Sequence, residues 1–165
     1  MRSAYEAITD ERDIAARIRQ LAPATVILDV EPLVAHWDSS QAALDAGIAA
    51  VIGSVAGIGG VRALCFSTNS ARSPSAPPDA PPGLQVSYLV SARKPLRVTS
   101  YAGLPRPGVV VGDQIATDGL LARRLGYAFL HFRPQREDMP PGPHLLAGCG
   151  EALRPLLFAR PLHRP

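Results

Sequence analysis

Short apolar runs alternate along this chain with longer segments of helical periodicity. Each run is uninterrupted, as in Val26-Ile27-Leu28, which is typical of a strand buried on both faces of a parallel sheet. The runs predict five strands, at residues 25–29, 61–66, 86–90, 107–111 and 127–132. The periodic segments predict four helices, at residues 10–21, 39–55, 118–126 and about 145–158. This alternation predicts an α/β fold, a three-layer Rossmann-like sandwich with a mostly parallel central sheet.

Caps and breakers agree with these bounds. Asp10 is suited to cap the first helix, Ser39 or Ser40 the second, and Gly126 is suited to end the third. Two further segments, 73–83 and 134–143, are rich in proline, so both are expected to be extended surface loops.

Acidic side chains follow two of the predicted strands. Asp29 and Glu31 end the first strand in TVILDVE, and Asp113 follows the fourth in VVVGDQIATDG. Asp118 lies five residues further on, where a helix begins. Parallel strands present their carboxyl ends at one edge of a sheet, so we expect these acids to converge there. Gathered carboxylates repel one another and need a cation, for which Mg2+, a hard ion that prefers oxygen ligands, fits best.

Two more polar residues follow predicted strands at the same edge. Ser67 follows the second strand and offers a hydroxyl to a phosphate oxygen. If the strand ends one residue later than predicted, Thr68 would take this role. Lys94, the chain's sole lysine, follows the third strand and offers a positive charge. A carboxylate nucleophile, Mg2+, a hydroxyl and an ammonium together predict a phosphoryl-transfer site in which Asp29 takes up the phosphoryl group.

In order and local form these segments resemble the motifs of the haloacid dehalogenase (HAD) superfamily. The family's motifs are DxDxT/V, a Ser or Thr after a strand, a Lys often followed by Pro, and GDxxxxD. They match Asp29-Val30-Glu31-Pro32-Leu33, Phe66-Ser67, Lys94-Pro95-Leu96 and Gly112-Asp113-Gln114-Ile115-Ala116-Thr117-Asp118. The string VGDQIATDGLLARRLGYAFLHFRP resembles the small, capless YqeG-type members of subclass IIIA, and the likeness covers about residues 20–134.

The resemblance implies a chemical role for each residue. Asp29 would attack phosphorus, and Glu31 would protonate the leaving oxygen and later activate water. Ser67 and Lys94 would hold the phosphoryl oxygens. The Mg2+ ligands would be Asp29, the Glu31 carbonyl and Asp113, supported by Asp118.

Glu31 departs from the family pattern, which has aspartate at this position. Glutamate is one methylene longer, and a misplacement of ~1 Å can cost on the order of a hundredfold in rate. Pro32 also restricts Glu31 to extended geometry. Two interpretations follow: a working phosphatase with a glutamate acid, or a non-catalytic interaction or regulatory module that lost turnover through Glu31-Pro32. A receiver-like phosphoacceptor is less favoured, because its usual pair of acids before the accepting aspartate is not found here.

The resemblance also bears on the substrate. HAD enzymes carry cap modules between the first and second motifs or between the second and third. Neither the interval from Asp29 to Ser67 nor that from Ser67 to Lys94 is long enough for a cap domain. An uncapped site would accept a phosphorylated lipid head group, protein or small molecule. YqeG-type relatives include phosphatidylglycerophosphate phosphatases, which makes a lipid phosphate one candidate.

Composition sets the remaining expectations. A length of 165 residues with 47% hydrophobic residues suits a single domain over residues 1–165. The net charge is +3, and the basic residues are scattered along the chain. Only 5% of all residues are aromatic, so we expect no nucleic-acid partner. The N-terminal MRSAYEAITDERDIAARIRQL has no apolar signal region and no apolar run reaches about 18 residues, which predicts a cytoplasmic protein without a transmembrane segment. Cys65 and Cys149 lack metal-type spacing and are expected to be buried, reduced thiols.

Plainer structural roles remain open for several of these residues. Asp118 could cap its helix, and Lys94 could be a solvated surface charge. Trp37 is expected to be partly buried against a helix. Three histidines lie apart without ligand spacing, so no zinc is assigned to His131, His144 and His163.

Overall fold

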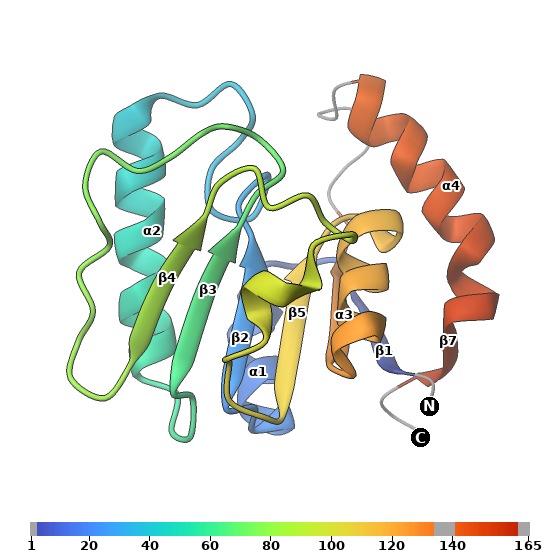
Figure 1. The fold of residues 1–165 in the computed structure, drawn as a ribbon, viewed down its shortest axis with the longest axis horizontal. Helices are drawn as coiled ribbons and strands as arrows, with labels where there is room; N and C mark the ends of the chain where they lie inside the picture. Colours follow the sequence, from blue (N-terminus) through green and yellow to red (C-terminus); the bar gives the residue numbers. More distant parts are fainter. Residues whose placement is uncertain (1–2, 134–140, 162–165) are drawn as a thin grey trace.

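The computed structural model describes residues 3–133 and 141–161 and shows a seven-stranded sheet flanked by helices (Figure 1). The strands are β1 (Ser3–Ile8), β2 (Thr25–Asp29), β3 (Ala63–Ser67), β4 (Gln85–Leu89), β5 (Gly108–Gly112), β6 (Ala128–Phe132) and β7 (Phe158–Pro161). They lie in the order β4-β3-β2-β5-β6-β1-β7, and the pairs among these described strands are parallel. The predicted α/β fold with a parallel sheet is confirmed.

The five predicted strands are all present. β2 coincides with the prediction, and the other four begin and end within two residues of their predicted bounds. The sequence pattern does not predict β1 or β7. β1 carries Glu6 near its centre, where the carboxylate lies 2.8 Å from Arg17 Nε, and β7 contains Pro161 and pairs irregularly with β1. A charged residue or a proline in a short strand hides it from a search for apolar runs.

The helices are α1 (Arg12–Leu21), α2 (Gln41–Ala56), α3 (Leu120–Leu125) and α4 (Pro141–Leu157), joined by a 3-10 turn η1 (Val98–Tyr101) and a π-helical turn η2 (Ile115–Gly119). Ser40 caps α2 by accepting a hydrogen bond from Ala43 N, as one of the two predicted caps. Asp10 Oδ1 accepts from Arg12 N at the start of α1. Gly126 ends α3 with a φ of 70°, a conformation that favours glycine.

The two proline-rich segments differ. Residues 73–83 form neither helix nor strand, as predicted, and are tied to α2 by bonds from Gln41 Nε2 to Ser73 O and from Ser75 N to Asp45 Oδ1. Of the second segment, residues 141–143 belong to α4, so the predicted loop is wrong there. Proline suits the first turn of a helix, where the backbone N–H has no helical partner. Residues 134–140 lie outside the described part of the chain.

Alternate residues of the buried strands face two apolar cores, one on each side of the sheet. In β2, Val26 and Leu28 join the core under α1 and α2, whereas Ile27 joins the core under η1, α3 and the end of α4. Successive side chains of a strand point to opposite faces, so a shift of one residue changes the core that a side chain joins. Helices thus cover both faces of the sheet, as in the predicted Rossmann-like sandwich (Figure 1).

The order in which successive strands are added across the sheet reverses next to β2. From β2 the chain continues to β3 and β4 on one side and then returns to β5 on the other side of β2 (Figure 1). In parallel α/β sheets, ligands bind beyond the carboxyl ends of the strands at such a reversal. β2 ends at Asp29 and β5 ends just before Asp113, so the fold places both predicted carboxylates at its expected ligand site.

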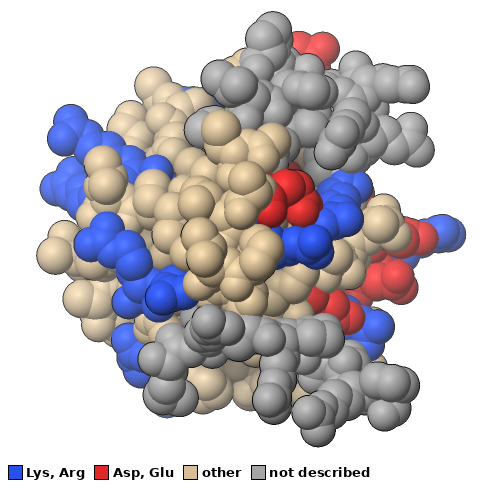
Figure 2. Space-filling view, turned by 90° about the vertical axis from the view of Figure 1, so that its right-hand side faces the viewer, with Lys and Arg blue, Asp and Glu red and all other residues tan. Residues whose placement is uncertain are grey.

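Charged side chains are spread unevenly over the surface. Figure 2 shows Lys and Arg without neighbouring Asp or Glu along the left of its view, which is the front of Figure 1, where η1 and α3 lie. Both signs of charge occur on the right of the same view. Among the described helices, none has the length and apolar character needed to cross a membrane.

The two cysteines lie in different environments. Cys65 in β3 is buried as predicted, and burial raises the pKa of its thiol to about 11. Cys149 is exposed, so the prediction that it is buried is wrong. α4 packs on η2 through the next residue, Gly150, where an added Cβ would lie 2.9 Å from Ile115 Cβ, and Cys149 lies outside that contact.

Candidate active site

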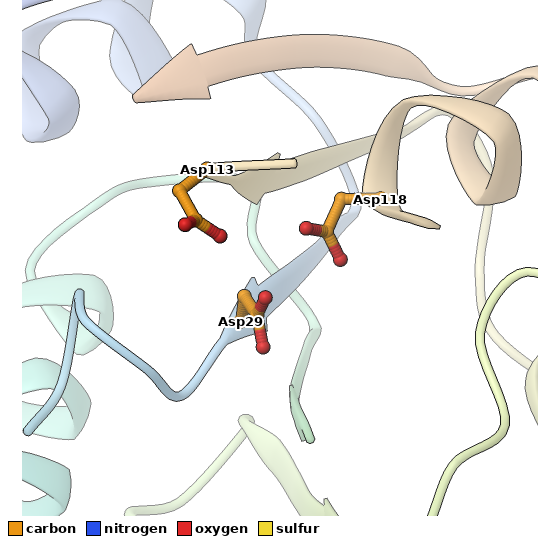
Figure 3. A group of neighbouring side chains, drawn as sticks. All are labelled: Asp29, Asp113 and Asp118. Carbon is orange, nitrogen blue, oxygen red and sulfur yellow. The ribbon is translucent and has the colours of Figure 1, made fainter. Parts of the chain in front are cut away.

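Three aspartates converge at the carboxyl edge of the sheet (Figure 3). Asp29 ends β2, Asp113 follows β5 and Asp118 lies in η2. One carboxylate oxygen from each lies within 4.8 Å of the others, and all three residues are buried. The carboxylates point into a common space between the two strand ends. The predicted convergence of these carboxylates is confirmed.

Lys94 is buried among the carboxylates. Its ammonium lies 2.7 Å from Asp29 Oδ1, 2.7 Å from Asp118 Oδ1 and 3.0 Å from the carbonyl oxygen of Ser67. Three acceptors use all three protons of an ammonium. Lys94 therefore belongs to the charge network of the site, and the alternative of a solvated surface lysine is wrong.

Asn69 holds the backbone that carries Lys94. Its Oδ1 accepts from Lys94 N at 2.7 Å, and its Nδ2 donates to Lys94 O at 3.1 Å. Ala92 N also donates to Thr68 O, so the loop after β4 is tied to the loop after β3. Bonds from a side chain to a distant backbone leave no periodic trace in a sequence, which is why Asn69 is not predicted.

The buried charges shift one another's protonation. Burial raises the pKa of Asp29 and the charge of Asp118 raises it further, whereas Lys94 opposes both. Burial, followed by the charge of Asp118, raises the pKa of Asp113 to about 7. For Lys94, burial favours loss of the proton, but Asp118 and Asp29 outweigh it and hold the pKa above its usual value. Lys94 therefore stays charged, and a bound cation would displace protons from the aspartates.

The Asp113 carboxylate is buried and unpaired among the described residues. Both of its oxygens are buried, and neither has a hydrogen-bond partner within the described residues. An unpaired buried polar group is costly, and a charged one more so. With all groups ionised, three carboxylates face one ammonium and leave two negative charges. An oxygen-only donor set of this charge fits a divalent hard cation such as Mg2+.

Asp118 lies in a tight turn that requires glycine nearby. Its Oδ1 bonds to Lys94, and its Oδ2 accepts from Gln114 N and Thr117 Oγ1 at 3.3 Å each. A Cβ added to Gly112 would lie 2.5 Å from Asp118 Oδ2, closer than real Cβ atoms come. The Gly of the Gly112-Asp113 motif therefore makes room for the second aspartate of the same motif. Asp118 thus has a role in the site beyond its place at the start of a helix.

Replacing Gly112 by alanine is expected to destabilise the fold, because the new methyl group must displace the Asp118 carboxylate. Overpacking of this kind costs about 1–3 kcal/mol. Urea unfolding measures the loss of stability. Gly53→Ala in α2 is the matched control: its Cβ meets nothing within 4 Å, and alanine in a helix gains roughly 0.5–1 kcal/mol over glycine. Equal unfolding stability of Gly112→Ala and Gly53→Ala would contradict the expected displacement of Asp118.

Ser67 and Thr68 face in different directions. The Ser67 hydroxyl lies 2.6 Å from the Tyr101 hydroxyl of η1, and the residue is fully buried. It shares a strand face with Cys65, which joins the core under η1. The prediction that the Ser67 hydroxyl faces a phosphate is therefore contradicted, and of Ser67 only the carbonyl reaches the site. Thr68, the alternative one residue further on, lines the cleft.

Glu31 is buried beside the cleft and held by two hydroxyls. Thr68 Oγ1 donates to Glu31 Oε2 at 2.6 Å, and Ser70 Oγ donates to Glu31 Oε1 at 3.3 Å. The side chain of Glu31, one methylene longer than that of an aspartate, thus reaches the loop after β3.

A cleft of about 410 Å³ opens at the site, and of the three aspartates only Asp29 lines it, together with Glu31. Trp37 is half-buried, as predicted, and lines this cleft. Arg72 donates to the carbonyls of His36 and Ser39 and so holds the loop that carries Trp37. The lining residues are Asp29, Glu31, Trp37, Thr68, Asn69, Ser70, Arg72, Lys94, Gln114 and Thr117.

His131 in β6 supports the site from behind. Its Nε2 lies 2.9 Å from the Asp113 carbonyl oxygen, and its Nδ1 lies 2.9 Å from the Tyr5 hydroxyl of β1. A carbonyl only accepts, so Nε2 carries the proton and Nδ1 accepts from Tyr5. Burial lowers the pKa of His131, which fits a neutral ring. The sequence pattern misses this contact because β1 itself is not predicted.

The structure thus brings together five of the six predicted site residues by their side chains: Asp29, Glu31, Lys94, Asp113 and Asp118. The sixth, Ser67, contributes its carbonyl alone. What the site can do follows from these residues. Comparison of the chain with protein-family models, with curated proteins and with solved structures found no significant match.

Proposed function

We propose that this chain is a Mg2+-dependent phosphomonoester hydrolase of the HAD type that works through an aspartyl-phosphate. The observation that supports it best is the convergence of Asp29, Asp113 and Asp118 beside an open cleft, with the Lys94 ammonium paired to Asp29 and Asp118. Carboxylates and a cation at the carboxyl ends of parallel strands are the groups that phosphoryl transfer needs.

Asp29 and Asp113 would hold the Mg2+, with the Glu31 carbonyl as a further oxygen ligand and Asp118 in support through Lys94. The two unpartnered oxygens of Asp113 favour this assignment. A bound Mg2+ would offset the charge of the carboxylates and of the phosphoryl oxygens.

Asp29 is suited to attack phosphorus through Oδ2. Its Oδ1 accepts from Lys94 Nζ and from Val30 N at 2.9 Å, and these bonds fix the carboxylate. Oδ2 forms the new bond to phosphorus while the bond from phosphorus to the leaving oxygen breaks. The leaving oxygen takes its proton from protonated Glu31. Asp29 then carries the phosphoryl group, and Glu31 is ionised.

Hydrolysis returns both residues to their first state. A water oxygen attacks phosphorus, the bond from phosphorus to Asp29 Oδ2 breaks, and Glu31 takes the proton of the water. Phosphate leaves, and Glu31 is again protonated for the next cycle. The bond that Glu31 accepts from Ser70 would orient it in the ionised half of this cycle.

Thr68 and Lys94 would hold the phosphoryl oxygens, with Thr68 in the place first predicted for Ser67. Thr68 donates to Glu31, and Lys94 donates to three protein oxygens. A phosphoryl oxygen would replace Glu31 at the Thr68 hydroxyl and one acceptor at the Lys94 ammonium. Substrate binding and release of Glu31 are therefore linked.

The openness of the cleft suits several phosphorylated substrates. Between β2 and Lys94 the chain forms α2, β3, β4 and the proline-rich loop, without a cap domain. A phosphate on a lipid head group, on a protein or on a small molecule would reach Asp29 in such a site.

A second candidate function is a non-catalytic interaction or regulatory module on the same fold. The bond between Glu31 and Thr68 favours it, because the glutamate carboxylate occupies the hydroxyl that a phosphoryl group needs. A side chain one methylene shorter, as in Asp, would release that hydroxyl. The two candidates therefore differ in what Glu31→Asp does.

Purified protein is expected to hydrolyse an aryl phosphate with Mg2+ and to stop when EDTA removes the metal. Glu31→Gln is expected to lower turnover by roughly a hundredfold to ten-thousandfold, the usual contribution of a general acid and base. Glu11→Gln, at the exposed position directly before α1, is the matched control and is expected to behave as wild type.

The Glu31 variants also separate the alternatives. An inactive wild type whose Glu31→Asp variant turns over would replace the proposed function by the second candidate. A stable phosphoryl adduct on Asp29 without hydrolysis would favour a receiver-like phosphoacceptor. Turnover that survives complete removal of the metal would contradict the proposed role of Mg2+.

Mg2+ is expected to stabilise the chain more as the pH rises through about 7, the raised pKa of Asp113. That pKa lies above the usual value of 3.8, so the metal-free folded state holds an extra proton between the two values. Its contribution to stability therefore falls as the pH rises from 3.8 towards 7, and Mg2+, which binds the ionised carboxylate, offsets the loss. Thermal unfolding with and without Mg2+ on both sides of that pKa measures the effect. An equal Mg2+ effect on both sides, or a full effect in Asp113→Asn, would contradict this linkage.

A further inference from the structure

Within the described residues, the segment 85–126 exposes arginines without exposed carboxylates. The segment 85–126 is described throughout, and its two acids, Asp113 and Asp118, are buried in the site. Its exposed charged residues are Arg93, Arg97, Arg106, Arg123 and Arg124. Figure 2 shows this as basic side chains along the left of the view, on the side of η1 and α3. The small net charge of +3 therefore hides a strongly basic side.

The two most exposed leucines of the described chain border these arginines. Leu96 is 76% exposed and Leu156 is 68% exposed. Arg124 Nη1 donates to Leu96 O at 3.0 Å, and Arg123 Nη1 donates to Leu156 O at 3.0 Å. Consecutive arginines of α3 thus link the loop after β4 to the end of α4. The arginine–leucine face is Arg93, Leu96, Arg97, Arg123, Arg124 and Leu156.

Leu96 is held outward by a well-bonded turn. Leu96 N and Arg97 N both donate to Arg93 O, at 2.8 and 3.2 Å. Asn69 fixes the backbone of Lys94 within this turn, and Arg124 also donates to Pro95 O at 2.7 Å. A side chain exposed on a fixed turn loses little conformational freedom when a partner covers it.

We propose that the arginine–leucine face docks on the surface of a bilayer that contains anionic lipids. Guanidinium groups bind phosphate groups in a forked geometry and are attracted to anionic head groups. Exposed leucines gain by entering the boundary between head groups and acyl chains. A nucleic acid would use the arginines but not Leu96 and Leu156, and the chain's 5% of aromatic residues offers few stacking platforms.

Docking in this way would place the cleft at the head-group layer. Arg93 directly precedes Lys94, and Leu96 follows it by two residues, so the face begins at the rim of the cleft. The docking does not depend on turnover, and it goes beyond the proposed function.

Co-sedimentation of the full chain with vesicles tests the proposal. We expect binding to vesicles of phosphatidylcholine mixed with phosphatidylserine, weaker binding at raised salt, and little binding to phosphatidylcholine alone. The double variant Arg93→Glu/Arg97→Glu is expected to lower the partition coefficient by at least about tenfold, since each charge near the membrane is worth roughly fivefold. Leu96→Ser is expected to lower the binding that remains at raised salt.

Arg62→Glu is the matched control. Arg62 is exposed and directly precedes β3, at the edge of the sheet opposite the cleft, so its reversal is expected to leave vesicle binding nearly intact. The proposal is overturned if wild type fails to bind anionic vesicles, if Arg62→Glu loses as much binding as the double variant, or if the face instead mediates self-association or retains an oligonucleotide more tightly than vesicles. Asp29→Asn binds vesicles as wild type under the proposal, so docking and turnover fail separately.

Discussion

Asp29→Asn is expected to abolish phosphatase turnover while leaving the fold intact. The substitution keeps the volume of the side chain and the oxygen that accepts from Lys94 and Val30, but it removes the oxygen that we propose as the nucleophile. Loss of a covalent nucleophile lowers turnover by roughly a thousandfold or more. Burial and the charge of Asp118 raise the pKa of Asp29, so a neutral amide here relieves repulsion instead of adding it. Aryl-phosphate hydrolysis with Mg2+ measures the loss, and mass spectrometry of acid-quenched protein shows whether a phosphoryl adduct forms.

The matched control for this prediction is Asp38→Asn. Asp38 is exposed on the loop after β2, near Trp37, and is not among the residues that line the cleft. Its variant is expected to keep full turnover and the same phosphoryl adduct. Asp29 would be ruled out as the nucleophile if Asp29→Asn unfolds at the wild-type temperature and still turns over substrate at close to the wild-type rate.

The sequence predicts the part of this site that depends on strand order alone. β2 is an apolar run with a defined end, and Asp29 terminates it. Asp113 follows a run of the same kind, and parallel strands bring such ends together whatever the loops between them do. The meeting of Asp29 with Asp113 was therefore predictable from two short segments far apart in the chain.

The orientation of single side chains was harder to predict. Ser67 and Thr68 are adjacent hydroxyl residues at the end of β3, and the pleat sends them in different directions. A sequence predicts the end of a strand only to within a few residues. An error of one residue moves a predicted side chain from the cleft to the buried face of the sheet. The Ser67 hydroxyl is hydrogen-bonded to Tyr101, which lies in η1. A 3-10 turn as short as η1 has no periodic pattern of apolar residues that a sequence could show.

The support behind Asp113 was not predictable from the pattern. It needs β1, whose Tyr5 reaches His131, and β1 is a short strand with Glu6 near its centre. The pairing of β1 with β6 joins two segments more than a hundred residues apart, Tyr5 lying opposite Phe129. Such long-range contacts are set by packing of the whole sheet and not by local propensity.

Lys94→Met is expected to be the most destabilising single substitution in the site. The Lys94 ammonium lies among Asp29, Asp118 and the Ser67 carbonyl, and its removal leaves buried carboxylates without their cation. Breaking a buried ion pair by removing one partner costs about 3–5 kcal/mol. Methionine fills nearly the same space, so the loss reports charge and not a cavity. Urea unfolding in EDTA measures it, and Arg93→Met, at the exposed neighbouring position, is expected to stay within about 0.5 kcal/mol of wild type.

The same variant tests whether charge balance governs the site. If the cost of Lys94→Met comes from unpaired carboxylates, then Asp118→Asn should offset part of it, and the double variant should be more stable than the sum of the single losses predicts. Mg2+ should also stabilise Lys94→Met more than wild type, because the ion then faces carboxylates with no ammonium among them. Additive losses, together with an unchanged Mg2+ effect, would show that Lys94 acts through packing and that the carboxylates do not share one charge network.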